Sequence, residues 1–226
     1  MDGYDLIVAG GGIAGICAAI QASRLGLRVA LLERELVLGG NANSTFKLHL
    51  EGANSPANWA RETGIIEEIE ADAMHEGAFL EPAGGMYGFF SDLLRRRCIE
   101  AGVELYAKTV VTGVKMSNGR VSTLHAFDML AHKQLDLQVG GFVVDATGDG
   151  AVALSAGAEY RMGREGKAEF GESFAPEKPD QRMMGSALMF LMRDTGRPVD
   201  YTPPQGTPFF ETKNDLPMYS ISAWDP

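Results

Sequence analysis

Three glycines near the start of the chain have the spacing of a turn that binds a pyrophosphate. Gly10, Gly12 and Gly15 follow the apolar run Tyr4–Ala9, a predicted buried parallel strand, and precede a predicted helix at 14–25. In such a turn the first glycine permits the bend, the second lets the backbone approach phosphate oxygens, and the third allows close packing of helix on strand. The sequence therefore predicts a dinucleotide site at a helix N-terminus.

An acidic residue closes the next apolar run, residues 28–33, which we predict to be a second strand. Glu33 follows Gly10 by 23 positions (33 minus 10), close to the separation of about 20 in dinucleotide-binding units. Its carboxylate can accept both hydroxyls of an adenosine ribose and would repel a 2'-phosphate, which disfavours NADP. The alternative is a strand-end glutamate in solvent, and the glycines upstream of Glu33 argue against it.

The middle of the chain departs from the pattern of an NAD-binding half, which continues with a crossover helix and a third parallel strand. Residues 39–44 are rich in turn formers and amides and indicate a loop, and residues 88–101 resemble a helix. From Val103 to about residue 140 we expect a β-meander of short antiparallel strands, with a hairpin turn at Asn118–Gly119. A further buried strand, residues 142–145, then enters a second glycine turn at 147–150.

With these features the chain resembles the FAD-dependent oxidoreductases of the glutathione-reductase-like FAD/NAD(P)-binding fold. The segments that carry the resemblance are IVAGGGIAGICAAIQASRLGLRVALLER, LGGNANS, ETGIIEEI, VVDATGDGAVALSAGAEYRMGREGKAEFGES and SALMFLMRDTGRPV. The resemblance spans nearly all of the chain to about Val199. The resemblance implies an α/β fold, namely a Rossmann-like FAD-binding domain with a parallel sheet, helices and a β-meander, followed by the start of a substrate domain.

The resemblance also implies roles for individual residues around FAD. Backbone at the first turn would meet the pyrophosphate, Glu33 and the adjacent Arg34 would lie at the adenosine ribose, and backbone in the meander would meet adenine. The second turn would lie near the ribityl and pyrophosphate groups, and the loop at Gly40 and Asn41 would pass along the flavin. The remaining implied cofactor residues are Gly10, Gly12, Ile13, Ala14, Gly15, Val111, Ala146, Thr147, Gly148 and Asp149.

Candidates for chemistry beside the flavin are few. His49, close to the flavin loop in sequence, could act as a base, although a packing or surface role is the alternative. Arg161 and Arg164 could hold an acidic substrate, and an exposed loop role is equally open. The histidines lack metal-ligand spacing, so we expect no metal site. Residues 34–97 contain no cysteine, which argues against thiol exchange.

Composition limits the partners and the compartment. The formal net charge of −10 argues against nucleic acid, since a phosphate backbone needs clustered Lys and Arg. The opening apolar stretch is shorter than the ~20 residues that span a bilayer, so we expect no membrane span. Only two cysteines and no recognisable signal peptide suggest the cytoplasm. A small-molecule substrate is the expected partner.

We expect an FAD-binding domain at 1–165, with a variable insertion at about 49–88, and the beginning of a substrate domain at 166–226. Six of the ten prolines fall in the final 29 residues, so we expect the 226 residues to be incomplete. A second chain or a C-terminal region would then complete the flavin site. The predicted activity is hydride transfer from a small organic substrate to FAD and on to an acceptor. An NAD-dependent dehydrogenase and a nucleotide-binding subunit without activity of its own remain the alternatives.

Overall fold

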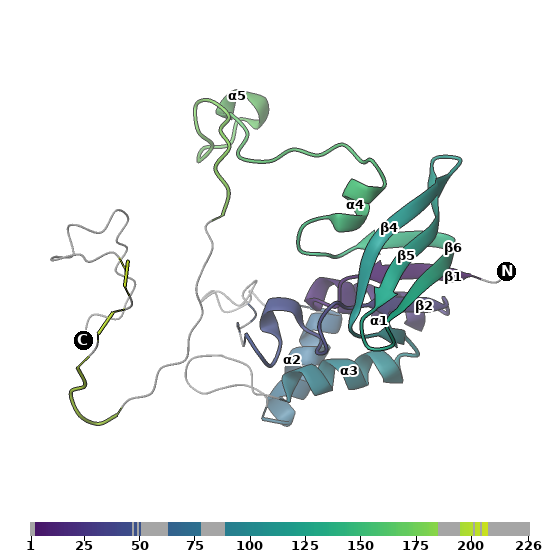
Figure 1. The fold of residues 1–226 in the computed structure, drawn as a ribbon, viewed down its shortest axis with the longest axis horizontal. Helices are drawn as coiled ribbons and strands as arrows, with labels where there is room; N and C mark the ends of the chain where they lie inside the picture. The colour runs from purple at the N-terminus through teal and green to yellow at the C-terminus, as the bar shows by residue number, and fades with distance from the viewer. Residues whose placement is uncertain are drawn as a thin grey trace. The chain divides into compact units, whose positions relative to one another are not determined.

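The computed structural model divides the chain into two units, Met1–Gly185 and Ser186–Pro226. The residues that it describes are 3–46, 48, 50, 63–77, 89–184, 195–200, 202–203 and 205–207. All helices and strands among them lie in the first unit (Figure 1). In the second unit, the Thr195 hydroxyl donates a hydrogen bond to the Arg197 carbonyl oxygen (2.7 Å). Residues 186–194, which carry part of the family resemblance, lie outside the described residues, and the domain boundary at residue 165 stays a prediction.

Six strands form the sheet of the first unit, in the order β3-β2-β1-β6-β5-β4. The strands are β1 (Tyr4–Ala9), β2 (Val29–Leu32), β3 (Glu104–Tyr106), β4 (Thr109–Ser117), β5 (Arg120–Asp128) and β6 (Lys133–Asp145). The helices are α1 (Ile13–Arg24), α2 (Ile65–His75), α3 (Phe90–Glu100), α4 (Ala151–Ser155), α5 (Lys167–Phe170) and the 3₁₀ turn η1 (Gly40–Ala42). Strands β3, β2, β1 and the end of β6 are parallel, whereas β4, β5 and the start of β6 form an antiparallel meander.

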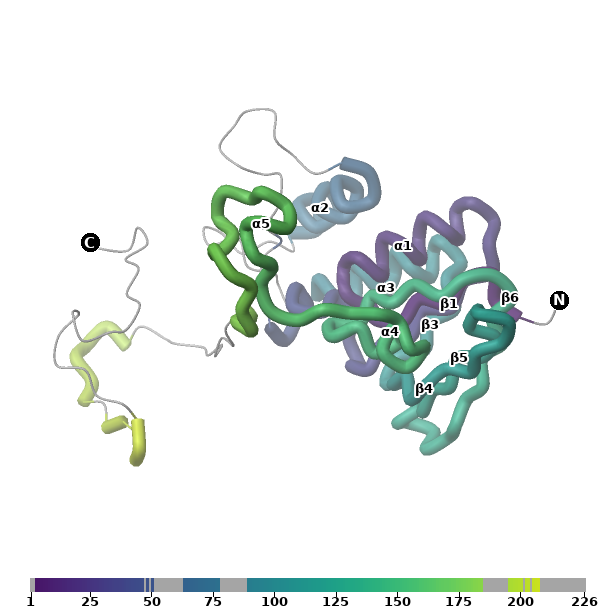
Figure 2. The backbone as a smooth tube through the Cα atoms, turned by 90° about the horizontal axis from the view of Figure 1, so that it is seen from above, coloured from purple at the N-terminus to yellow at the C-terminus, as the bar shows by residue number. Residues whose placement is uncertain are grey.

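Alternate residues of β1 divide the core into two layers, because successive side chains of a strand point to opposite faces. Leu6 and Val8 pack with the buried faces of α1 and α3. Ile7 and Ala9 pack with Leu124 of β5 and its neighbours in the meander. Figure 2 shows the two helices on one side of β1 and the meander strands on the other. The central strands are therefore covered on both faces, as a parallel sheet requires.

Strand β3 corrects the expectation that the third parallel strand is missing. Residues 104–106, predicted as the beginning of the meander, pair in parallel with β2 and follow the crossover helix α3. The meander itself begins only at Thr109. The chain turns between the two strands at Ala107 and Lys108, and Lys108 adopts a positive φ of 50°. No glycine, proline or asparagine stands at this turn, so the sequence does not indicate that one strand ends and another begins here.

Strand β6 corrects the expected boundary between the meander and the last parallel strand. The sequence predicted two strands separated near residue 140, whereas the structure has one strand of 13 residues. The pairing of β6 with β1 shifts register between Tyr4 and Leu6, beside Gly140 and Gly141. A Cβ built on Gly141 would lie 2.2 Å from the Asp5 carbonyl oxygen, so these glycines permit a close backbone approach at a bulge.

Helix α2 is the described helical part of the insertion predicted at residues 49–88. Its buried side chains, Ile69 and Ala73, join the same core cluster as α1 and α3. Arg24 at the end of α1 makes two hydrogen bonds to the carboxylate of Glu68, at 2.9 and 2.7 Å. The insertion thus contributes a helix that packs against α1 and α3.

Candidate dinucleotide site

The first glycine turn is shaped by backbone contacts that exclude larger residues. Gly10 has a φ of +105°, and a Cβ there would lie 2.3 Å from the Ala146 carbonyl oxygen. A Cβ on Gly15 would lie 2.0 Å from the Gly10 carbonyl oxygen and 3.1 Å from the Ala146 Cβ. These two glycines are therefore required by the protein itself, because α1 and the end of β6 meet at the turn.

Gly12 and Gly148 differ from those glycines because nothing in the described protein requires them. Gly12 has an ordinary extended conformation (φ −70°, ψ 174°), and the nearest atom to a Cβ there would be the Gly40 Cα at 3.9 Å. A Cβ on Gly148 would meet nothing within 4 Å. Open space beside a glycine of a phosphate-binding pattern is what a bound pyrophosphate needs. The turn therefore fits the group that the sequence predicts.

Backbone N–H groups gather where α1 and η1 begin. Gly39 N–H donates to the Gly11 carbonyl oxygen (2.8 Å), which places the start of η1 beside the first turn. The N–H groups of Ala14, Gly40 and Asn41 have no acceptor among the residues that the structure describes. The first amides of a helix lack intrahelical partners and carry its positive dipole end. No acidic side chain occupies the first turn of α1, so these dipoles are free to face an anion.

Glu33 joins the end of β2 to the glycine turn. One carboxylate oxygen accepts the Gly11 N–H (2.7 Å), and the other accepts the Glu35 N–H (2.7 Å). Each oxygen retains acceptor capacity, which two ribose hydroxyls could use. The side chain of Arg34 is 73% exposed and lies 3.4 Å from the Glu35 carboxylate. Arg34 is thus near the predicted ribose position without a fixed contact to Glu33.

Strand β4 reaches the same edge of the sheet as Glu33. Thr109 N–H donates to the Glu33 carbonyl oxygen (2.8 Å), and Lys108 N–H donates to that of Glu35 (3.1 Å). Val111 follows two residues later and packs against the cluster on the meander side of the sheet. Strand β4, which carries the predicted adenine residue Val111, therefore begins beside Glu33, the predicted ribose residue.

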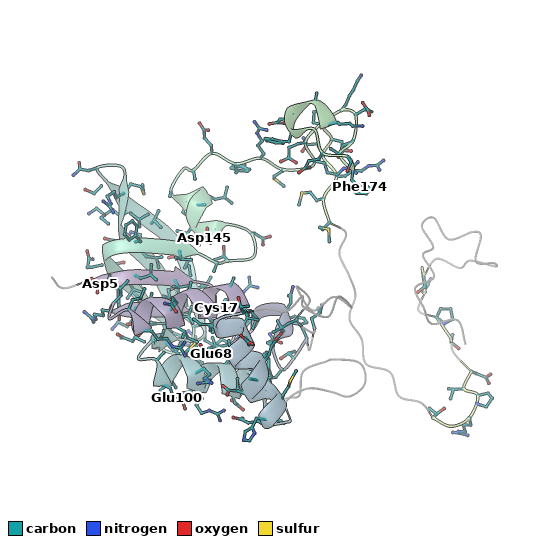
Figure 3. The ribbon with its side chains drawn as sticks, turned by 180° about the vertical axis from the view of Figure 1, so that it is seen from behind. Asp5, Cys17, Glu68, Glu100, Asp145 and Phe174 are labelled. Atoms are coloured by element: carbon teal, nitrogen blue, oxygen red, sulfur yellow. The ribbon has the colours of Figure 1, made fainter. Side chains whose placement is uncertain are left out.

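Asp145, at the end of β6, organises the second glycine turn (Figure 3). One carboxylate oxygen accepts the Thr147 hydroxyl (2.6 Å) and N–H (3.1 Å), and the other accepts the Ala153 N–H (2.8 Å). Burial opposes ionisation, but these hydrogen bonds, with one from Val152 N–H, hold the pKa of Asp145 below its ordinary value. The sequence pattern pointed to residues 146–149 and not to Asp145, although an aspartate at the end of a strand commonly accepts the N–H two residues later and starts a turn.

The remaining predicted site residues do not join this cluster in the described structure. Arg161 pairs with Glu169, and Arg164 makes a two-point contact with Asp180, whose pKa falls to about 2 beside that guanidinium. His49 lies outside the described residues. The side chain of Asp149 is exposed and makes no hydrogen bond or ion pair with the part of the chain that the structure describes.

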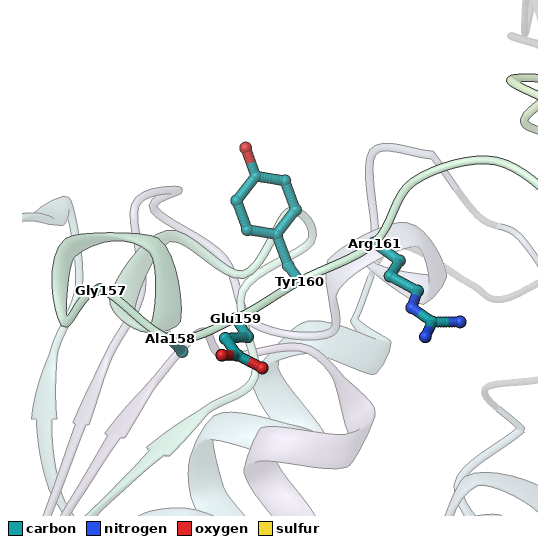
Figure 4. A pocket seen from close by; sticks show the side chains of 5 residues that line it. All are labelled: Gly157, Ala158, Glu159, Tyr160 and Arg161. Carbon is teal, nitrogen blue, oxygen red and sulfur yellow. The ribbon is translucent and has the colours of Figure 1, made fainter.

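A hollow near these arginines is formed by one short stretch of chain, residues 157–161. Figure 4 shows the side chains of Glu159, Tyr160 and Arg161 extending in different directions from that stretch. A surface made by consecutive residues with diverging side chains offers no convergent polar groups, which a ligand site needs. The glycine turns, rather than this hollow, are the candidate site.

Both cysteines are poor nucleophiles. Burial raises the pKa of the Cys98 thiol to about 12 and also raises the pKa of Cys17. Among the described residues, no three His, Cys, Asp or Glu side chains are grouped as metal ligands, and no helix is long and apolar enough to cross a membrane.

Comparison with known proteins decides the family. The family model for FAD dependent oxidoreductases matches residues 5–222. The chain belongs to this family. Its cofactor is therefore FAD, which agrees with the glycine turns and with the repulsion that Glu33 would offer to a 2'-phosphate.

Two curated relatives and one solved structure show the range of similar proteins. The probable electron transfer flavoprotein-quinone oxidoreductase YgcN of Escherichia coli K12 is 27% identical over 210 residues, covering 85% of this chain and 49% of that protein. Pseudooxynicotine dehydrogenase of a Pseudomonas species is 36% identical over 83 residues, covering 37% and 16%. The myxobacterial chondrochloren halogenase CndH shares the fold, with a TM-score of 0.52, 24% identity and coverage of 73% and 41%. The chain thus spans at most about half the length of these relatives.

The Asp145 network predicts an acid-dependent loss of stability. Asp145→Asn should lower the free energy of unfolding by about 1.5–3 kcal/mol at pH 7, since it loses charge-assisted hydrogen bonds. Because the folded pKa lies below the ordinary value near 3.9, the deficit should be complete above that pH and shrink as the pH falls further. Urea unfolding across pH tests this, with the exposed Asp149→Asn as the control; an Asp145→Asn deficit that does not change between neutral and acid pH would contradict it.

Proposed function

We propose that this chain binds FAD across its two glycine turns and serves an enzyme that oxidises a small organic substrate. The observation that supports this most is Gly12, a glycine with ordinary backbone angles and open space where a Cβ would be. No contact with the described residues requires a glycine there, whereas close approach of a pyrophosphate does. The nearby amides of Ala14 and Gly40, which have no acceptor among the described residues, supply the positive ends of dipoles that an anion needs.

The proposed contacts follow the order of groups along FAD. The amides at the start of α1 hold the pyrophosphate, and Glu33 accepts the adenosine ribose hydroxyls. The backbone of Val111 meets adenine. The second glycine turn lies along the ribityl chain. The residues assigned to the cofactor are Gly10, Gly12, Ile13, Ala14, Gly15, Glu33, Arg34, Gly40, Asn41, Val111, Ala146, Thr147, Gly148 and Asp149.

Bound FAD supplies the group that accepts a hydride from substrate and passes it to a further acceptor. The chain's own part is to orient the cofactor, neutralise its pyrophosphate and keep its binding turns rigid. His49 as a base and Arg161 or Arg164 as a carboxylate contact remain proposals. The two curated relatives are named as an oxidoreductase and as a dehydrogenase of pseudooxynicotine, and this favours oxidation of an organic compound.

The function is tested by the cofactor that the protein releases. Purified chain, saturated with FAD and freed of excess, should release FAD on denaturation and lose its visible flavin absorbance anaerobically with an organic hydride donor. Release of NAD without flavin would refute the cofactor assignment. Bound FAD that no donor in a panel of amines, alcohols and hydroxy acids reduces would favour a nucleotide-binding subunit.

Gly12→Ala should separate cofactor binding from folding. The new methyl has room in the protein, and alanine at compatible angles stabilises a fold by about 0.4–1 kcal/mol, so the free energy of unfolding should not fall. The same methyl would crowd the pyrophosphate and weaken FAD binding by about 5- to 150-fold. Gly15→Ala is the contrasting variant, because its Cβ would lie 2.0 Å from the Gly10 carbonyl oxygen and should destabilise the fold. Fluorescence titration and urea unfolding give the two readouts.

Glu33→Ala should weaken FAD binding by about 10- to 150-fold, because it removes a charged acceptor worth about 1.5–3 kcal/mol. Glu35→Ala is the matched control: it removes the same charge two residues away and leaves intact the Glu35 N–H that Glu33 accepts. The Kd of FAD should change by less than about threefold in that control, as exposed ion pairs contribute little. Equal losses in the two variants would mean that net charge, not the Glu33 contact, governs binding.

A further inference from the structure

Two serines far apart in the sequence tie the flavin loop, residues 38–44, to the first turn of α3. The Ser91 hydroxyl donates to the Leu38 carbonyl oxygen (2.7 Å) and accepts the Ser44 N–H (3.0 Å). The Ser44 hydroxyl in turn accepts the Ser91 N–H (3.2 Å). Ser91 is therefore hydrogen-bonded to both ends of the loop: its hydroxyl contacts Leu38 and Ser44, and its backbone N–H contacts Ser44.

This hydrogen-bond cluster is built into the core. Ser91 is 3% exposed, and so is Asn43, whose side-chain oxygen accepts the N–H groups of Thr45 and Phe46 (2.8 Å each). A Cβ on Gly39 would lie 3.1 Å from a methyl carbon of Leu94, so α3 also packs directly on the loop. Breaking a buried cluster of this kind leaves polar groups unsatisfied, because water does not replace the lost partner.

Two glycines with positive φ shape the held loop and place Gly40 against the first glycine turn. Gly39 and Gly40 have φ values of +117° and +57°, and a Cβ on Gly40 would lie 3.1 Å from the Gly12 Cα. In this arrangement the N–H groups of Gly40 and Asn41 have no acceptor within the described part of the chain. Glycines keep alternative conformations open, so contacts outside the loop must select this one.

We propose that Ser91 is a positioning residue for FAD: its hydrogen bonds to Leu38 and Ser44 fix the loop so that the Gly40 and Asn41 amides are preorganised for the cofactor. The inference rests on the proposed function, since it names a determinant of affinity at that same site. Ser91 acts through the loop and touches no reacting atom. A loop that samples other conformations reduces the competent fraction of the free protein and weakens the Kd in proportion.

Ser91→Ala tests the proposal against Ser23→Ala. The Ser23 hydroxyl of α1 donates to the Ala101 carbonyl oxygen (2.6 Å), directly after α3, so the control also removes a hydroxyl-to-carbonyl bond that ties α3 to the fold. Titration of the full chain with FAD should give a Kd about 5- to 30-fold weaker for Ser91→Ala. Ser23→Ala should lower stability to urea and leave the Kd within about twofold.

Hydrogen exchange of the FAD-free protein provides a readout that does not depend on the cofactor. Amides of residues 39–46 should exchange faster in Ser91→Ala than in the unchanged protein and in Ser23→Ala. Ser91→Thr, which keeps the hydroxyl, should restore both slow exchange and affinity. If Ser91→Ala does not fold, Ser44→Ala removes one of the three bonds at a less buried position and should weaken the Kd about two- to fivefold.

The outcomes separate this inference from the function on which it rests. An unchanged chain that binds no FAD overturns the proposed function and, with it, the role of Ser91 toward the cofactor. An unchanged chain that binds FAD, together with an unaltered Kd and unaltered exchange at 39–46 in the serine variants, overturns the positioning role alone. Equal weakening by Ser91→Ala and Ser23→Ala also overturns it, because general loss of stability would then explain the effect.

Discussion

The close approach of three backbone segments at the first glycine turn is the constraint on which the rest of the structure depends. On one side the turn touches Ala146 at the end of β6, at distances that admit no Cβ at Gly10 or Gly15. On the other side Gly11 accepts a hydrogen bond from the Gly39 N–H. The contact fixes where the first turn of α1 meets the end of β1, and the buried side chains of the helix then pack on that strand. Strand β1 lies between β2 and β6 in the sheet, and the segments that follow all three strands meet at this turn.

Local dipoles, not the overall field, must make this site attractive to an anion. The chain carries a formal net charge of −10, so its long-range potential opposes a pyrophosphate. Partial charges on helix amides act over one turn and are largely unaffected by distant carboxylates screened by salt. The carboxylate of Glu33 fits this arrangement because it accepts a hydrogen bond from the Gly11 N–H, which stabilises its negative charge beside the proposed cofactor site. Recognition thus depends on geometry within a few ångströms.

Residue patterns predicted the local elements of the fold well and their pairing less well. Strand β1, helix α1 and the turn at Asn118–Gly119 follow from apolar runs and turn residues, and the structure has all three. The parallel pairing of β3 was not predictable, because the turn at Lys108 has no residue that signals it. Gly140 and Gly141 suggested a break where the structure has a bulge. Glycine marks close backbone approach as well as turns, and only tertiary context separates the two.

The same limit applies to the candidate site, where spacing predicted Gly12 and Glu33 and no sequence pattern pointed to Ser91. A serine in the first turn of a helix is common, and nothing within α3 reveals that it contacts a loop 47 residues earlier. Such contacts arise when a crossover helix returns to the sheet edge at which the cofactor loop ends. Local spacing in a motif therefore identifies the groups that contact a ligand. The residues that hold those groups in place can lie far away in the sequence, because the topology of the fold brings them together. For this chain, α3 links the packing of the helical layer to the shape of the flavin loop.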